Sequence, residues 1–147
     1  MEQLEKNPDK WIRKEVSARL NNQVVNTKTI PVVDVNFTGE TQPLNYIAMS
    51  TQTKEEATFT KCKKQWQCTI LLDCITRYLG TNNTGSRVLV NDIEERVISL
   101  MKDFEIEGGF NVYRPIEVES STSQDGDTGT ETYFRQLIRY RIWLTED

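Results

Sequence analysis

The spacing of apolar residues along the chain predicts two helices and several strands. A first helix is expected over about residues 8–20, because Asn7-Pro8-Asp9 favours a helix start. Apolar residues then recur at helical spacing: Trp11, Ile12, Val16 and Leu20. Asn21-Asn22 follows, and we expect the helix to end there.

The middle of the chain changes to an alternating pattern that is typical of strands. Residues 30–37 place Val33, Val35 and Phe37 on one side, and a second short strand is expected at residues 46–49, after Pro43. Lys54-Glu55-Glu56 is expected to be an exposed tip between strands. The longest strand signal runs from about Phe59 to Tyr78, and the even positions from Trp66 to Cys74 are apolar. We expect that even face to lie on the core.

The second half predicts a helix followed by a hairpin. Residues 80–85 are expected to form a loop, after which Ser86 can cap a helix. That helix has a predicted buried stripe of Val90, Ile93, Val97, Leu100, Met101 and Phe104. Two strands of the hairpin are indicated by alternating apolar residues: Val112, Ile116 and Val118 on one, and Phe134, Ile138, Tyr140, Ile142 and Leu144 on the other. Residues 120–130 between them contain no apolar residue, so we expect a linker that is mobile when the chain is alone.

These elements predict an α+β fold. Strands outnumber helices, and we expect a mainly antiparallel sheet with long β-hairpins and both helices packed on one face. The 147 residues are expected to form a single domain over 1–147, with no internal repeat.

Composition narrows the classes of function. The chain has 18 Lys and Arg against 22 Asp and Glu, and a net charge of −4 argues against a dedicated duplex-binding protein. Histidine is absent, which removes the commonest metal ligand and the usual group for proton transfer at neutral pH. Three cysteines indicate reduced thiols, and the polar N-terminus lacks a signal peptide, so synthesis in a cytoplasm and no membrane partner are expected.

The candidate chemical motifs have simpler structural explanations. Cys62, Cys68 and Cys74 are each six residues apart, roughly 20 Å on a strand, too far to share a zinc ion. Asp125-Gly126-Asp127 resembles part of a calcium loop, but the twelfth position is Gln136 instead of glutamate. The acidic residues of the second helix region are expected on an exposed face: Asp92, Glu94, Glu95 and Glu105. We therefore expect no enzyme activity, no metal and no cofactor.

Basic residues form the remaining candidate surface. Arg135, Arg139 and Arg141 share the odd face of the last predicted strand, and Lys61 and Lys63 share the odd face of the long strand. If the even faces meet the core, one sheet face carries a basic stripe with Tyr133 and Trp143. That stripe is a solvated face, an intersubunit surface that meets acidic residues of a neighbour, or a single-strand nucleic-acid site on stacked aromatic residues.

The ordered features resemble the tail-completion or tail-terminator family of tailed bacteriophages. The features that carry the resemblance span roughly residues 8–145. They are the N-terminal helix, Ile30-Pro31-Val32-Val33, the Pro43 to Met49 strand, the long strand that ends near Tyr78, the helix entered by Thr84-Gly85-Ser86, and the closing Phe110-Asn111-Val112 and Tyr133 to Trp143 segments. The Lys-rich stretch from Lys61 to Lys64 departs from the family pattern.

The resemblance implies a structural role in a virion. Such proteins form a homo-oligomeric ring, a hexamer or dodecamer, at the head-to-tail joint or the tail end, and DNA passes through the lumen without sequence recognition. Their neighbours are connector, portal or tail-tube proteins. The segments that meet neighbours would be residues 50–64 and 120–133 here. The expected subunit-interface residues are Lys61, Lys63, Lys64, Asp125, Asp127, Arg135, Arg139 and Arg141.

Two functions of other classes compete with the virion ring. One is a single-stranded nucleic-acid-binding module that uses the basic stripe, and salt-dependent oligonucleotide binding by the monomer would favour it. The other is a small ligand-binding α+β domain, which needs a pocket with convergent polar groups that no motif indicates.

Overall fold

The computed structural model describes residues 6–34, 43–56, 64–80 and 85–146. Within these residues, two helices and eight strands follow one another. Their bounds are α1 Asp9–Leu20, β1 Gln23–Val25, β2 Lys28–Ile30, β3 Val32–Val33, β4 Asn45–Glu56, β5 Gln65–Leu79, α2 Val88–Leu100, β6 Phe110–Val112, β7 Glu117–Asp127 and β8 Glu131–Glu146.

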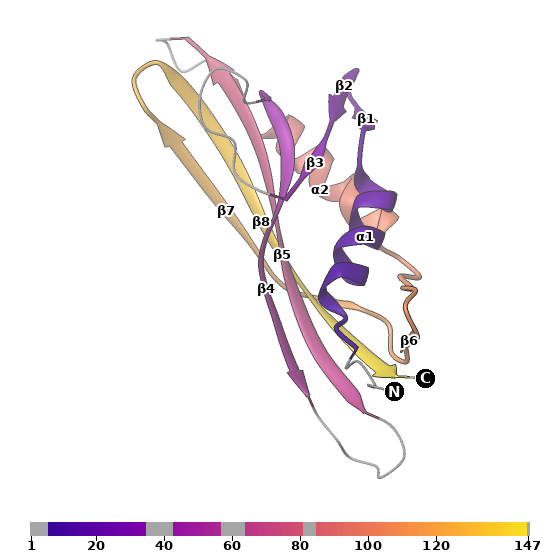
Figure 1. The fold of residues 1–147 in the computed structure, drawn as a ribbon. Helices are drawn as coiled ribbons and strands as arrows, with labels where there is room; N and C mark the ends of the chain where they lie inside the picture. The colour runs from indigo at the N-terminus through magenta and orange to yellow at the C-terminus, as the bar shows by residue number, and fades with distance from the viewer. Residues whose placement is uncertain (1–5, 35–42, 57–63, 81–84, 147) are drawn as a thin grey trace.

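Most strands belong to one long, curved sheet of six strands (Figure 1). The strand order is β3-β4-β5-β8-β6. β7 pairs with the same edge of β8 as β6 does, but with an earlier part of that strand. All pairings in it are antiparallel except β3 with β4, and β1 and β2 form a separate hairpin. The predicted α+β class with a mainly antiparallel sheet and long hairpins is confirmed.

Both helices cover the same face of the sheet, as predicted (Figure 1). The core between them contains Ile12, Val16 and Leu20 of α1, Val90, Ile93 and Val97 of α2, and the even positions Cys68, Ile70, Leu72 and Cys74 of β5. Ile138, Ile142 and Leu144 of β8 complete it, each with no exposed surface. Trp66 is only partly buried and packs at the margin, where its indole N–H donates to the Glu146 carboxylate.

Side chains near the predicted starts accept a hydrogen bond from the first backbone amide of each helix. The Asn7 Oδ1 accepts a hydrogen bond from the Asp9 amide at 3.0 Å, and Ser86 Oγ accepts one from the Val88 amide at 3.3 Å. Such bonds stabilise a helix N-terminus, which otherwise leaves four amides unpaired.

The strand predicted over residues 30–37 is wrong in its bounds. Ile30 ends a hairpin of β1 and β2, and only Val32 and Val33 pair with β4; residues 35–37 lie outside the described residues. The hairpin turns at Asn26 and Thr27, both with positive φ, as a two-residue hairpin loop requires. The three-residue arms were too short to show an alternating pattern.

β4 is longer than predicted and continues through Lys54-Glu55-Glu56. These residues were expected to form a tip between strands, but they pair with Cys68, Gln67 and Trp66 of β5. Backbone pairing to β5 extends the strand although its side chains there are exposed.

The mobile linker predicted over residues 120–130 is the largest error. Residues 120–127 belong to β7, whose register runs from Glu117 opposite Arg141 to Asp127 opposite Thr132. The turn is confined to residues 128–130, where Gly129 has a φ of 90°. The strand expected across Val112, Ile116 and Val118 is accordingly two strands, β6 and β7. Within the described residues, no helix is long and apolar enough to cross a membrane.

Candidate functional site

The three predicted arginines of β8 lie on the sheet face that points away from the helices. They alternate with Ile138 and Ile142, which are fully buried in the helix-side core. This confirms the predicted division of β8 into an apolar and a basic face. Whether the face contacts a neighbouring subunit stays a prediction.

Arg135 binds a buried carboxylate on that face. Asp73 of β5 is 3% exposed, and Arg135 donates to both of its carboxylate oxygens, with 3.2 Å between Nε and Oδ1. The hydrogen bonding that Arg135 donates to the Asp73 carboxylate is the main reason that the pKa of Arg135 is raised. The charges therefore neutralise each other within the sheet.

A further ion pair neutralises a second arginine of the predicted basic stripe. Arg141 donates to Glu119 of β7 at 2.7 Å, whereas Arg139 contacts the Thr69 hydroxyl at 3.5 Å and has no ion pair with a described carboxylate. Lys64 directly precedes β5, and Lys61 and Lys63 lie outside the described residues. A nucleic-acid groove needs uncompensated positive charge, so the paired arginines argue against that function.

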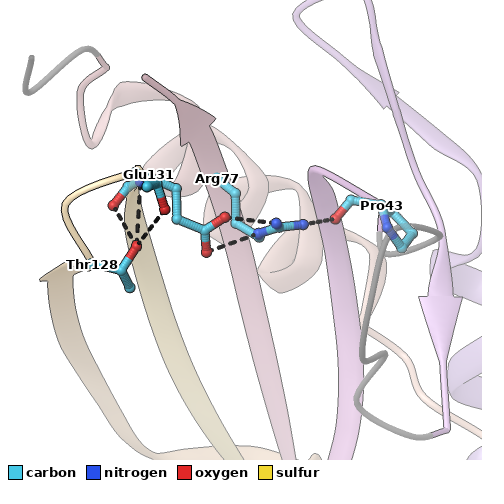
Figure 2. Close-up of polar contacts among 5 residues, drawn as sticks. Pro43, Arg77, Thr128 and Glu131 are labelled. Carbon is cyan, nitrogen blue, oxygen red and sulfur yellow. Dashed lines mark hydrogen bonds and ion pairs between the residues drawn. The ribbon is translucent and has the colours of Figure 1, made fainter. Parts of the chain in front are cut away.

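Arg77 of β5 contacts the first residue of β8 and the segment just before β4, at the end of the sheet where β7 turns into β8 (Figure 2). It donates to both carboxylate oxygens of Glu131 at 3.3 and 2.7 Å, and to the Pro43 carbonyl at 3.1 Å. Thr128, on the other side of the turn, bonds to Glu131 through both its amide and its hydroxyl. The turn of the β7–β8 hairpin is thereby fixed to β5 and to the start of β4.

A second polar network attaches β7 to α2. Arg87, just before α2, donates to the carboxylate of Asp125 and to the Gln136 amide oxygen at 2.8 Å. Gln136, 5% exposed, in turn donates to the Ser121 hydroxyl at 2.6 Å, which donates to Glu94. Asp125 therefore has a partner within its own chain.

Sequence analysis missed Asp73, Arg77, Arg87 and Glu119 as polar anchors. Asp73 lies on the odd positions of β5, the same face as the β8 arginines, so its position in a strand could have indicated a partner. The pairing of Glu119 with Arg141 depends on β7 being a strand, which its composition concealed.

The acidic residues do not assemble a reactive or metal-binding site. Asp92 accepts from the Asn26 amide at 2.5 Å, Glu94 binds Ser121, and Glu95 and Glu105 are exposed. No group of three His, Cys, Asp or Glu side chains that could hold a metal ion occurs in the part of the chain that the structure describes.

Cys68 and Cys74 are buried free thiols, as predicted, while Cys62 lies outside the described residues. Burial in the core raises the pKa of Cys68 to about 12 and also raises the pKa of Cys74. These thiols are unreactive core residues, because the thiolate is the reactive form.

An open hollow of about 510 Å³ lies between the end of α2 and the segment that joins β6 to β7. Its lining is mostly apolar and includes Ile98, Tyr113, Ile116 and Val118. Tyr140 contributes a buried hydroxyl that has no hydrogen-bond partner among the described residues, and burial raises its pKa. Charged residues also line the hollow: Lys102, Asp103, Glu105 and Arg114.

Comparison with known proteins finds a similar fold in one solved structure. No protein-family model and no curated protein matches the sequence. Among solved structures, the chain is similar to a chain in the "Virion of native gene transfer agent (GTA) particle", with a TM-score of 0.55 and 10% sequence identity. The match covers 76% of this chain and 78% of that chain. The two chains share a fold over about three quarters of their lengths.

Proposed function

We propose that the protein is a structural component of a tailed-phage virion and forms a ring at the head-to-tail joint or the tail terminus. The observation that carries this proposal is the fold shared with a chain of the gene transfer agent virion. The sequence resemblance to tail terminators implies the same class of particle. In that role the ring is homo-oligomeric, contacts connector, portal or tail-tube proteins, and lets DNA pass through its lumen.

The form of the subunit supports a ring. The sheet extends beyond the helices at both ends, through the β7–β8 hairpin at one end and through β4 and β5 at the other (Figure 1). Extended hairpins can reach a neighbour, and a head-to-tail contact closes into a ring when its rotation allows.

Locating the chain in purified particles tests the proposal. We expect mass spectrometry to detect the chain in virions and cryo-electron microscopy to show it as a ring between the portal and the tail tube. A location on the capsid shell, or absence from the particle, would overturn the proposal.

Oligonucleotide binding by the purified subunit separates the competing function. We expect a dissociation constant for a single-stranded oligonucleotide no tighter than about 10⁻⁴ M at physiological salt, the weak end of non-specific binding. Tight binding that weakens steeply with salt would favour the nucleic-acid-binding module instead.

A further inference from the structure

The strand β7 leaves one backbone edge of the sheet open. It pairs only with β8, and nearly all of its eleven residues are exposed. Proteins usually block such an edge with Lys, Pro or a covering segment, because its unpaired amides and carbonyls accept another strand. β7 contains neither Lys nor Pro, and no described strand pairs with its outer side. The edge is therefore available to a further strand.

Alternation of the ladder identifies the amides on this edge. The Thr128 amide donates to the Glu131 carbonyl across the hairpin, and the register from this turn back along β7 is regular. In an antiparallel pair, every second residue exchanges hydrogen bonds with its partner. Ser121, Ser123 and Asp125 therefore direct their amides to the open side.

The charged side chains of β7 are all acidic: Glu117, Glu119, Asp125 and Asp127. The first three are each paired with an arginine of their own chain. Asp125 nevertheless keeps half of its side-chain surface exposed, and Asp127 has no cationic partner among the described residues. These two side chains are two residues apart on a strand and share one face. The end of the edge near the hairpin turn thus presents two carboxylates, one of them uncompensated.

One segment of the chain has the composition of a strand that fits this edge. Residues 57–63 connect β4 to β5 and lie outside the described residues. They read Ala-Thr-Phe-Thr-Lys-Cys-Lys, with two lysines and no acidic residue, Gly or Pro. Thr and Phe favour strands, and a tight hairpin turn needs only about two residues, usually with Gly or Asn. In an extended chain Lys61 and Lys63 share one face, at the same spacing as Asp125 and Asp127.

This segment cannot reach the carboxylates of its own subunit. It is attached at Glu56, where β4 ends, and at Lys64, just before β5 begins. Asp125 lies level with Thr76 across β8, eleven residues beyond Gln65. Eleven strand residues span roughly 36 Å, whereas a seven-residue segment attached at both ends extends no more than about 14 Å. Only a second copy of the chain can bring the two together.

We propose that residues 57–63 of one copy of this chain add as a strand to the β7 edge of the next copy, with Lys61 and Lys63 beside Asp125 and Asp127. This inference rests on the proposed ring function and names its subunit contact. Backbone hydrogen bonds join the strands, and charge selects the partner, because opposite charges across a strand pair stabilise it and like charges destabilise it. The segment and the edge differ, so each copy offers one of each and the contact can continue around a ring.

A charge-reversal variant tests the segment. Lys61→Glu with Lys63→Glu places like charges against the β7 edge. Lys14→Glu with Lys28→Glu makes the same change of net charge at two exposed lysines of α1 and β2 and is the control. Circular dichroism confirms that each variant is folded, and analytical ultracentrifugation of the full-length chain measures self-association.

A proline variant tests the edge. Ser123→Pro removes an outward amide of β7 and leaves its backbone bonds to β8. Ser123→Ala is the matched control, because both changes lose the side-chain bond to Gln136 but only proline removes the amide.

We expect the lysine reversal and Ser123→Pro each to self-associate at least about tenfold more weakly than their controls. A mixture of these two variants is decisive, because Ser123→Pro keeps its lysine segment and the lysine reversal keeps its β7 edge. The mixture should form one-to-one dimers that do not grow. Self-association of the lysine reversal at the strength of its control would overturn the inference, as would wild-type association of Ser123→Pro.

The remaining outcomes separate the contact from the proposed function. A wild-type chain that stays monomeric at its highest soluble concentration overturns the inferred contact and leaves the β7 edge to a different protein, while a ring seen in particles still supports the function. Placement of the chain outside the head-tail axis would overturn the function and leave a contact measured in solution intact.

Discussion

The contribution of an individual arginine to the stability of this sheet is expected to be larger when its carboxylate partner is buried. Arg135 compensates the buried Asp73, whereas Arg139 contacts only a threonine hydroxyl among the described residues. Removing one partner of a buried pair leaves an uncompensated charge, but removing an unpaired surface charge changes little. The two arginines occupy the same face of the same strand, so they form a matched pair for measurement.

Arg135→Met should lower the free energy of unfolding by about 3 kcal/mol, while Arg139→Met should change it by less than about 0.5 kcal/mol. Urea denaturation followed by circular dichroism measures both. Replacing Asp73 together with Arg135, as Asp73→Leu with Arg135→Met, should recover much of the loss, because no charge then remains buried. Equal effects of the two single changes would contradict the assigned pairing.

Burial of the Cys68 thiol predicts a dependence of stability on pH. The pKa is raised from 9.0 to about 12 in the folded protein, so above pH 9 the unfolded chain loses this proton and the folded chain keeps it. The free energy of unfolding should therefore fall as pH rises from 9 toward 12, by at most about 1.4 kcal/mol per pH unit for this group. Cys68→Ala should reduce the slope measured by urea denaturation between pH 9 and 10, while Cys74 and Tyr140, whose pKa values are also raised by burial, continue to contribute. An unchanged slope would contradict the burial of Cys68.

At the scale of elements, apolar periodicity predicted the parts of the fold that have a core side. The two helices and the core face of β5 follow from side chains such as Val97 and Leu72, which are buried because of their position in the pattern. β7 could not be predicted in this way, because its exposed polar residues pair through the backbone with β8. The basic residues of β8 were predicted on one face, but Glu119, the partner of Arg141, was missed because β7 was not recognised as a strand.

Hydrogen exchange distinguishes the strand β7 from the mobile linker that composition indicates. In the free subunit, the amides of Thr122, Gln124 and Gly126 should exchange slowly, and those of Ser121 and Ser123 should exchange fast. Arg87→Ala should accelerate exchange along β7, because Arg87 binds Asp125 and Gln136. Nuclear magnetic resonance resolves the individual amides, and Lys14→Ala on the distant α1 is a suitable control. Uniformly fast exchange over residues 120–127 would restore the linker interpretation.

At the scale of the whole molecule, one core connects nearly all of the described elements. Residues of α1, α2, β4, β5 and β8 belong to the same buried cluster, and the Arg77 contacts fix the hairpin turn to it. In the proposed assembly, a subunit built in this way would dock as a rigid body. This arrangement also makes the expected single domain testable.

The three tryptophans report from different parts of the molecule and should unfold together. Trp11 lies on α1, Trp66 near the start of β5 and Trp143 on β8, where Arg114 lies 4.1 Å from its ring. A small single domain unfolds in one cooperative transition, because no part of a shared core is stable alone. Three variants that each keep one tryptophan, with the other two replaced by phenylalanine, should therefore give the same urea midpoint by fluorescence as by far-ultraviolet circular dichroism within each variant. A Trp11 transition that precedes the loss of sheet signal would show that α1 detaches from the sheet independently, and the subunit would then dock as two parts instead of one.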